Sequence, residues 1–286
     1  MLPDFKIQWY PGHMAKAKRN IKENLSLVDL IIEVRDARAP LASANPTLSS
    51  LGEHKKRIIV LNKADLADDA VTQKWQALFP EAIVFSGKET QSIKILQKKL
   101  DQIGQKLKAD WLQREKGLRP YRALILGMPN VGKSTIINAL SRSSKAKTGE
   151  KPGVTRGKQW ISLPNGWQLL DTPGVMVPEA VIGNTGLFLA LINAIEEKLY
   201  DEELAALHFL KWLLENKPQT LSERYKISNI DDPLALLEEI GRKRGCLRSG
   251  GYVETSKAAL ILLRDFREGH LGRLSLEIPE TLVERS

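Results

Sequence analysis

The chain has 286 residues, of which 42% are hydrophobic and 27% are charged, and it carries a formal net charge of +9. This length allows one full α/β domain and a smaller second one, and the positive charge indicates a polyanionic partner. No apolar run is long enough to cross a membrane, and residues 1–6 resemble neither a signal peptide nor a transit peptide. A single cysteine, Cys246, excludes an intrachain disulfide, so we expect a protein of the reducing cytoplasm.

Short apolar runs alternate with helical patterns as far as residue 174. The runs predict buried strands at residues 28–34, 57–61, 82–85, 121–126 and 167–170. The patterns predict helices at residues 14–25, 69–78, 93–108 and 133–140. This alternation favours an α/β domain at residues 1–177, with a mostly parallel sheet and helices on both faces. Only helical patterns follow, at 201–215, 230–243 and 254–268, so we expect a smaller all-helical domain at residues 178–286.

A phosphate-binding loop is predicted at residues 127–134, which read GMPNVGKS and match the pattern G-x-x-x-x-G-K-[ST]. The loop follows an expected strand and opens an expected helix, where backbone N–H groups and the helix end bind phosphate. Lys133 is expected to reach the β- and γ-phosphates and to act in catalysis, and the Ser134 hydroxyl is expected to bind Mg²⁺. The residues expected to contact the phosphates are Asn130, Val131, Gly132, Lys133, Ser134 and Thr135.

Base specificity is predicted from a second motif, NKAD, which begins at Asn62 directly after another strand. The Asp65 carboxylate would accept hydrogen bonds from N1–H and the exocyclic amine of guanine, and adenine has no such pair of donors. Asn62 would brace the neighbouring loops, and the stem of Lys63 would lie on the base. Ser86 and Gly87 follow a further strand, where a backbone amide would meet guanine O6, although Ser-Gly is also an ordinary loop dipeptide. The predicted ligand is therefore GTP and not ATP.

A segment that senses Mg²⁺ and the γ-phosphate is expected around Asp171. Residues 171–174 (DTPG) end an apolar strand, so Asp171 is expected to hold Mg²⁺ through water and the Gly174 amide to contact the γ-phosphate. Upstream of it, Thr155 is the better candidate for a switch threonine that joins Mg²⁺ and acts in catalysis, with Thr148 second. The same upstream segment is more basic than one nucleotide requires, with Lys145, Lys147, Lys151, Arg156 and Lys158.

The order of these motifs indicates a circular permutation, because NKAD precedes the phosphate loop. Residues 9–17 (WYPGHMAKA), 36–40 (DARAP), 242–247 (RKRGCL) and 249–251 (SGG) add further signatures. With them, the chain resembles the circularly permuted ribosome-assembly GTPases of the YlqF/RbgA family. The resemblance implies a permuted P-loop GTPase domain with a helical RNA-binding domain. It also implies GTP hydrolysis that is stimulated by the ribosomal particle and assists late assembly of the large subunit. The implied partners are the large subunit or its precursor and ribosomal RNA, with no membrane and no DNA.

The resemblance also implies roles for residues outside the nucleotide motifs. Val175 stands where many GTPases have a glutamine that orients the attacking water, and His13 is implied to act in its place. From the residues alone, His13 would be a loop or capping histidine. Asn130 is similar to an asparagine that holds K⁺ beside the phosphates in potassium-dependent GTPases. The residues implied to bind RNA, which composition alone would assign to a solvated helix end, are Arg242, Lys243, Arg244 and Arg248.

Two other functions stay open at this point. Val175 also suits a GTP-gated RNA-binding placeholder in which hydrolysis is incidental, and single-turnover measurements with bound particle would distinguish it. A GTPase that serves an RNA-modification enzyme would carry the same nucleotide motifs and would differ in what it co-purifies with.

Overall fold

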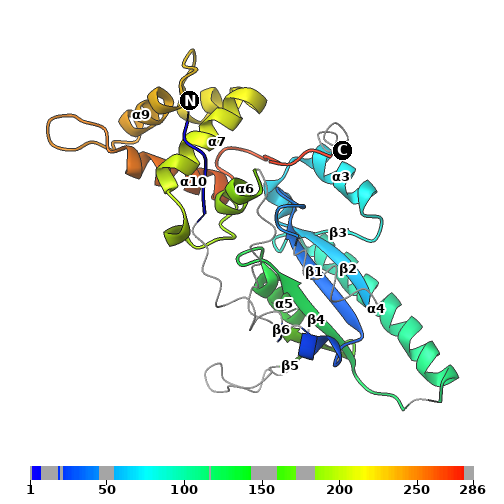
Figure 1. The fold of residues 1–286 in the computed structure, drawn as a ribbon. Helices are drawn as coiled ribbons and strands as arrows, with labels where there is room; N and C mark the ends of the chain where they lie inside the picture. Colours follow the sequence, from blue (N-terminus) through cyan, green and yellow to red (C-terminus); the bar gives the residue numbers. More distant parts are fainter. Residues whose placement is uncertain are drawn as a thin grey trace.

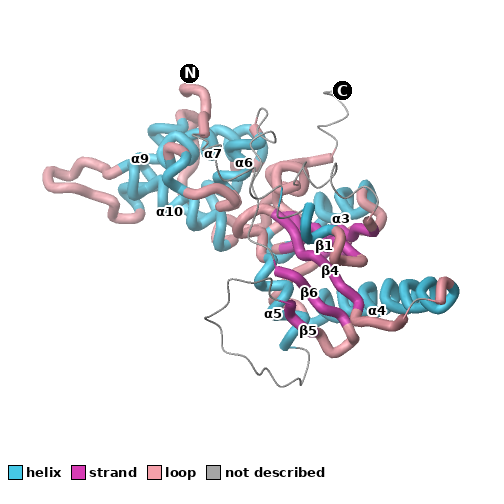
Figure 2. The backbone as a smooth tube through the Cα atoms, turned by 60° about the horizontal axis from the view of Figure 1, so that its bottom comes forward, coloured by secondary structure: helices cyan, strands magenta, loops and turns pink. Residues whose placement is uncertain are grey.

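The computed structural model describes residues 2–7, 19, 22–44, 55–115, 117–142, 160–171 and 184–279, with Arg142 and Asp171 described by their backbone alone. A half built on a β-sheet lies beside a half built of helices (Figures 1 and 2). The boundary expected near residue 177 lies outside the described residues, as does most of the helix expected at 14–25. No helix in these ranges is long and apolar enough to cross a membrane.

A six-stranded sheet forms the first half, in the order β3-β2-β1-β4-β6-β5. All neighbouring strands are parallel except β5, which runs antiparallel to β6. The five predicted strands are confirmed, whereas β5 was not predicted because three residues are too few to show a pattern. The strands are β1 (Leu30–Asp36), β2 (Lys56–Asn62), β3 (Ile83–Val84), β4 (Tyr121–Gly127), β5 (Trp160–Ser162) and β6 (Trp167–Asp171).

Helices cover both faces of the sheet because successive side chains of a strand point to opposite faces. In β1, Leu30 and Ile32 join the core under α4 (Thr90–Gln113) and α5 (Lys133–Arg142). Ile31 points the other way and packs with Leu25, which belongs to the helical residues 22–25. On this second face α3 (Asp69–Leu78) buries Trp75 against Leu61 of β2. The predicted helices at 69–78, 93–108 and 133–140 are therefore confirmed, and α4 extends beyond its predicted ends.

The second half contains the helices predicted beyond residue 201 and two that were not predicted. Asp201 and Asp232 accept hydrogen bonds from first-turn amides and cap α7 and α9. The unpredicted helices, α6 and α8, have seven residues each, too few to display a helical period. The elements are α6 (Thr185–Leu191), α7 (Glu202–Asn216), α8 (Gln219–Tyr225), α9 (Pro233–Lys243) and α10 (Thr255–Glu268).

The two described ends of the chain cross over: the amino end packs against the helical half, and the carboxyl end packs against the sheet half. Residues 2–7 pack beside α7, where the His208 ring lies 2.8 Å from the Pro3 carbonyl and the rings of Phe5 and Tyr200 are 6.0 Å apart. The segment after α10 leaves the helical half and crosses to the sheet near α3 (Figure 1). The two halves are thus connected at several points outside the segment that joins β6 to α6.

Candidate nucleotide-binding site

The loops that carry the nucleotide motifs leave the same edge of the sheet. The strand register pairs Val34 with Gly127 and Asp36 with Asn62, so β1, β2 and β4 end side by side. Asp171 ends β6 and is paired with Ile125, two residues before the phosphate loop begins. In parallel α/β sheets this carboxyl edge is where ligands bind.

The phosphate loop needs its glycines for both space and backbone conformation. A Cβ atom on Gly127 would lie 2.5 Å from the Val34 carbonyl oxygen, because β4 and β1 are close there. Gly132 has φ +96°, and Asn130 also has a positive φ, 57°. A backbone of this kind turns its N–H groups toward one centre and forms an anion-binding hollow.

Lys133 begins α5 and folds back over the loop. Its Nζ donates to the carbonyl oxygens of Met128 at 2.9 Å and Gly127 at 3.3 Å, and the side chain is buried. The ammonium group is therefore held at the centre of the loop. Ser134 and Thr135 follow on the first turn of α5, and both are exposed.

Asn62 joins the base-reading motif to the phosphate loop. Its side chain is buried, and Nδ2 donates to the Val131 carbonyl oxygen at 2.7 Å. A Cβ atom on Gly132 would lie 2.1 Å from that Nδ2, so the glycine also makes room for this contact. Asn62 thus makes the bracing contact that its motif predicts, and its partner is the loop at 127–134.

Asp65 is held in place by two donors from the loop that follows β3. Ser86 Oγ donates to Oδ1 at 3.0 Å, and Lys88 Nζ lies 2.7 Å from Oδ2. Burial raises the pKa of Asp65, but the hydrogen bonds from Lys88 and Ser86 outweigh it and leave that pKa below its usual value. The carboxylate is therefore ionised at neutral pH, as a group that accepts from guanine must be.

The loop after β3 also approaches the phosphate loop. The Ser86 amide donates to Ser92 Oγ, whereas the Gly87 amide has no acceptor among the described residues and is available to a base oxygen. A Cβ atom on Gly87 would lie 2.5 Å from Thr135 Cγ2. A groove of about 570 Å³ continues from this contact between α4 and α5; its lining includes Lys94.

Lys63 takes part in a buried ionic cluster with two residues of the DARAP segment. Its Nζ lies 3.0 Å from Asp36 Oδ2, and the Arg38 guanidinium contacts both oxygens of the same carboxylate at 3.0 Å. Burial raises the pKa of Asp36, but Arg38 and Lys63 outweigh it and hold that pKa far below its usual value. Arg38 also lies over the Phe266 ring of α10 at 4.8 Å, which connects this cluster to the helical half.

Asn130 connects the phosphate loop to the helical half as well. Its Nδ2 donates to the Asn193 carbonyl oxygen at 2.8 Å, just after α6. The bond uses the amide nitrogen of Asn130 and not its carbonyl oxygen Oδ1. The sequence suggested the cation but had no signal for the contact, because 63 residues separate the two asparagines.

The four basic residues predicted to bind RNA all have partners within the chain. Arg242 pairs with Glu238 and Glu239 on α9, and Lys243 Nζ donates to the Lys226 carbonyl oxygen. Arg244 contacts the buried Asp265 and lies over the ring of Tyr225, and Arg248 pairs with Glu254.

The loop between α9 and α10 extends away from the rest of the molecule (Figure 1). On it the Tyr252 side chain is 76% exposed and Leu247 is 51% exposed. The loop therefore presents an aromatic ring to solvent, next to arginines that already pair with carboxylates.

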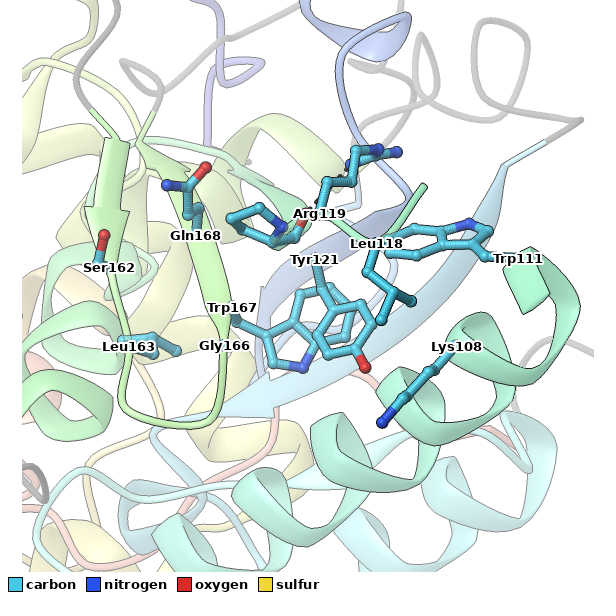
Figure 3. A pocket seen from close by; sticks show the side chains of 11 residues that line it. Lys108, Trp111, Leu118, Arg119, Tyr121, Ser162, Leu163, Gly166, Trp167 and Gln168 are labelled. Atoms are coloured by element: carbon cyan, nitrogen blue, oxygen red, sulfur yellow. Dashed lines mark hydrogen bonds between the residues drawn. The ribbon is translucent and has the colours of Figure 1, made fainter. Parts of the chain in front are cut away.

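A second hollow, of about 320 Å³, lies at the opposite edge of the sheet (Figure 3). It contains none of the predicted site residues. The rings of Trp111, Tyr121 and Trp167 pack there at 5.3–5.5 Å, and Arg119 lies over Trp111 and pairs with Asp29. These residues form a packed aromatic cluster at that edge of the sheet.

Several predicted residues lie outside what the structure describes. They are His13, Thr155 and Gly174, together with the side chain of Asp171. Within the described ranges, no group of three or more histidine, cysteine or acidic side chains is arranged to hold a metal. Ser134, the residue expected to bind Mg²⁺, is exposed and follows Lys133 on the first turn of α5.

Comparisons with known proteins agree with this arrangement. A family model described as "50S ribosome-binding GTPase" matches residues 122–231, and the NKAD motif lies upstream of the match, as a permuted chain requires. The chain is 42% identical to Ribosome biogenesis GTPase A of Bacillus cereus, over 98% of this chain and 96% of that protein. It is 35% identical to the Thermotoga maritima protein of the same name, over 97% and 96% of the two chains.

Solved structures give the same result. The crystal structure of GNP-bound YlqF from T. maritima matches with a TM-score of 0.66 and 33% identity, covering 93% of this chain and 99% of that chain. The GDP-bound structure matches with a TM-score of 0.64. Identity at this level along nearly the whole of both chains means that the protein belongs to the circularly permuted GTPases of the ribosome biogenesis GTPase A family.

Proposed function

We propose that this GTPase assists late assembly of the large ribosomal subunit in the cytoplasm. One observation carries the proposal: the permuted nucleotide loops converge on one sheet edge in a chain that resembles Ribosome biogenesis GTPase A along nearly its whole length. In this proposal GTP orders the switch segment, the ordered form binds the RNA of the immature particle, and hydrolysis releases the protein.

The proposed nucleotide contacts divide into base and phosphate groups. Asp65 reads guanine, supported by its ionised state and by the Gly87 amide nearby. Lys133 replaces its contacts with loop carbonyls by contacts with the β- and γ-phosphates. Ser134, Thr155 and Asp171 hold Mg²⁺, which supplies positive charge at the phosphates. Asn130 holds K⁺ through Oδ1, and its Nδ2 bond to Asn193 is compatible with that role.

Hydrolysis is proposed to depend on His13. Val175 cannot hydrogen-bond water, so the residue after the DTPG motif cannot orient the nucleophile, and a histidine can do so. The Gly174 amide and Thr155 would sense the γ-phosphate and order the surrounding segment. The particle would then stimulate hydrolysis by bringing His13 to the attacking water.

The helical domain, proposed as residues 178–286, is the part that contacts ribosomal RNA. The positive charge is provided by Arg242, Lys243, Arg244 and Arg248, although carboxylate partners compensate that of the three arginines in part. The exposed ring of Tyr252 offers a stacking surface for an unpaired base on the same loop.

The test is the GTP hydrolysis rate in KCl buffer, with and without purified large subunits, for wild type and His13→Ala. We expect strong stimulation by the subunits, and we expect His13→Ala to abolish it while nucleotide affinity survives. A rate that does not respond to subunits would contradict particle-stimulated hydrolysis. It would favour the GTP-gated placeholder, which the valine at position 175 also suits.

A further inference from the structure

The segment that follows α10 forms a strap across the sheet half. We call residues 269–277 the C-terminal strap; it runs from the end of α10 to α3 (Figure 1). Gly269 ends α10 with φ +80°, and a Cβ atom there would lie 2.7 Å from Leu66 Cδ2. The strap therefore begins in contact with the turn that contains Asp65, since Leu66 is the next residue.

Three consecutive strap residues supply hydrogen-bond partners to that turn. The Arg273 guanidinium donates from Nη2 to the Ala64 carbonyl oxygen and from Nε to the Ala67 carbonyl oxygen, both at 2.8 Å. The Leu274 amide donates to the Leu66 carbonyl oxygen at 3.0 Å. Ser275 Oγ accepts from the Asp68 amide at 3.1 Å.

The far end of the strap, at Leu276 and Glu277, is also held by several hydrogen bonds. The Glu277 carboxyl group accepts from the amides of Leu41 and Ala42 at 2.7 and 2.8 Å, and the backbone carbonyl oxygen of Glu277 accepts from Trp75 Nε1 at 3.1 Å. The Leu276 amide donates to the Arg38 carbonyl oxygen at 2.8 Å. Leu271, Leu274 and Leu276 are buried, so docking of the strap also removes apolar surface from water.

The contacts of Arg273 are to backbone carbonyls that flank Asp65, the residue proposed to bind guanine. Asp65 sits in the 3-10 turn Ala64–Leu66, which begins after Lys63 in a left-handed conformation, φ 59°. The carbonyls of Ala64 and Ala67 are on either side of it in sequence, and one planar guanidinium holds both. A lysine cannot do this, because its single ammonium group cannot supply two fixed donors in one plane.

We propose that Arg273 is a positioning residue for guanine recognition, which holds the turn of Asp65 in the conformation that reads the base. The inference rests on the proposal that Asp65 binds guanine, and it makes the C-terminal strap a working part of the nucleotide site. Arg273 touches neither base nor phosphate; it acts through the backbone of the turn. It lies outside the motifs described in the sequence analysis.

The test compares the affinities of GDP and IDP. IDP differs from GDP only in lacking the exocyclic amine, from which Asp65 would accept a hydrogen bond. For Arg273→Ala we expect GDP and GTP to bind about tenfold more weakly, equivalent to about 1.4 kcal/mol. We expect the preference for GDP over IDP to shrink and the ratio of GTP to GDP affinity to stay unchanged. Arg273→Lys should resemble Arg273→Ala, because the paired donors are missing.

Asp69→Ala is the matched control, because Asp69 pairs with Nη1 and Nη2 of the same guanidinium, whereas the two carbonyl oxygens accept from Nε and Nη2. Its removal leaves both carbonyl contacts, so the GDP-to-IDP preference should stay at the wild-type value. The preference is a ratio of two affinities and is insensitive to the fraction of protein that is folded.

Asp65→Ala separates failure of the inference from failure of the proposed site. If Asp65→Ala keeps the wild-type preference for GDP, guanine is read elsewhere and the proposed base contact is wrong. If Asp65→Ala abolishes the preference while Arg273→Ala and Arg273→Lys keep it, the positioning role of Arg273 is overturned and the base contact stands. A strap that only stabilised the fold would give that second result.

Discussion

Asn62 and Gly132 should behave as one energetic unit, although they belong to different motifs. Asn62→Ala removes the bond from Nδ2 to the buried Val131 carbonyl and leaves that oxygen unpaired, which costs about 1–3 kcal/mol. Gly132→Ala places a side chain at φ +96°, which costs a further, separate penalty of about 1–3 kcal/mol. Its Cβ atom would also lie 2.1 Å from Asn62 Nδ2, so the amide must swing away and the same hydrogen bond is lost.

The double variant tests this reasoning, because a hydrogen bond can be lost only once. Gly132→Ala alone should therefore cost about 2–6 kcal/mol, and adding Asn62→Ala to it should cost little more. The coupling energy should equal the hydrogen-bond term, about 1–3 kcal/mol. The measurement is the free energy of unfolding in urea for wild type, both single variants and the double variant.

Gly117→Ala is the control substitution, because a Cβ atom there would have no heavy atom of the described residues within 4 Å beyond its own chain neighbours. It should change the free energy of unfolding by less than about 0.5 kcal/mol. Additivity of Asn62→Ala and Gly132→Ala within about 0.5 kcal/mol would refute the shared-contact argument. The two motifs would then be neighbours without energetic coupling.

Three further predictions concern the strap, the buried ionic cluster and the exposed loop. Burial raises the pKa of Glu277 to about 7, so the folded protein holds a proton there that the unfolded chain releases above pH 4.5. Stability should therefore fall by about 3 kcal/mol as pH rises from 4.5 to 7, and Glu277→Gln should flatten this fall in urea titrations; an unchanged slope would contradict it. Asp36→Asn leaves Arg38 and Lys63 without their carboxylate and should cost about 3–5 kcal/mol of unfolding free energy at pH 7, whereas a loss below about 1 kcal/mol would show that the cluster contributes little. Tyr252→Ala should weaken binding to purified large subunits by about tenfold without changing basal GTP hydrolysis, and unchanged subunit binding would remove this ring from the RNA surface.

Much of the sheet and of the nucleotide site could be predicted because the signals are local. A phosphate loop is a short pattern between a strand and a helix, and Gly132 has a φ of +96°, a local backbone conformation that favours glycine. The position of Asn62 and Gly127 at the same edge of the sheet also follows from parallel strands that end there. By contrast, β5 and α8 escaped prediction because a segment of three or seven residues has too few positions to show a period.

Contacts across long sequence separations could not be predicted in the same way. Arg273 meets Ala64 across 209 residues, and a backbone carbonyl accepts from any donor, so no residue type in the turn points to its partner. The ion pairs of the basic run at 242–248 were likewise only partly predictable. Its charge is visible in the sequence, and Arg242 pairs with Glu238 one turn away on the same helix, but the pairing of Arg244 with Asp265 depends on how α9 and α10 pack.

The sequence by itself determined which loops carry the nucleotide-binding motifs and the order in which a permuted chain presents them, because such motifs rest on local backbone geometry and a few side chains of fixed chemistry. Only the tertiary structure decided what holds these loops in place. Asn62 reaches the phosphate loop, Asp36 and Arg38 hold Lys63, and the strap holds the turn of Asp65. These supports are hydrogen bonds and buried ion pairs between segments far apart in the chain, and they exist only after the sheet and the helices have packed.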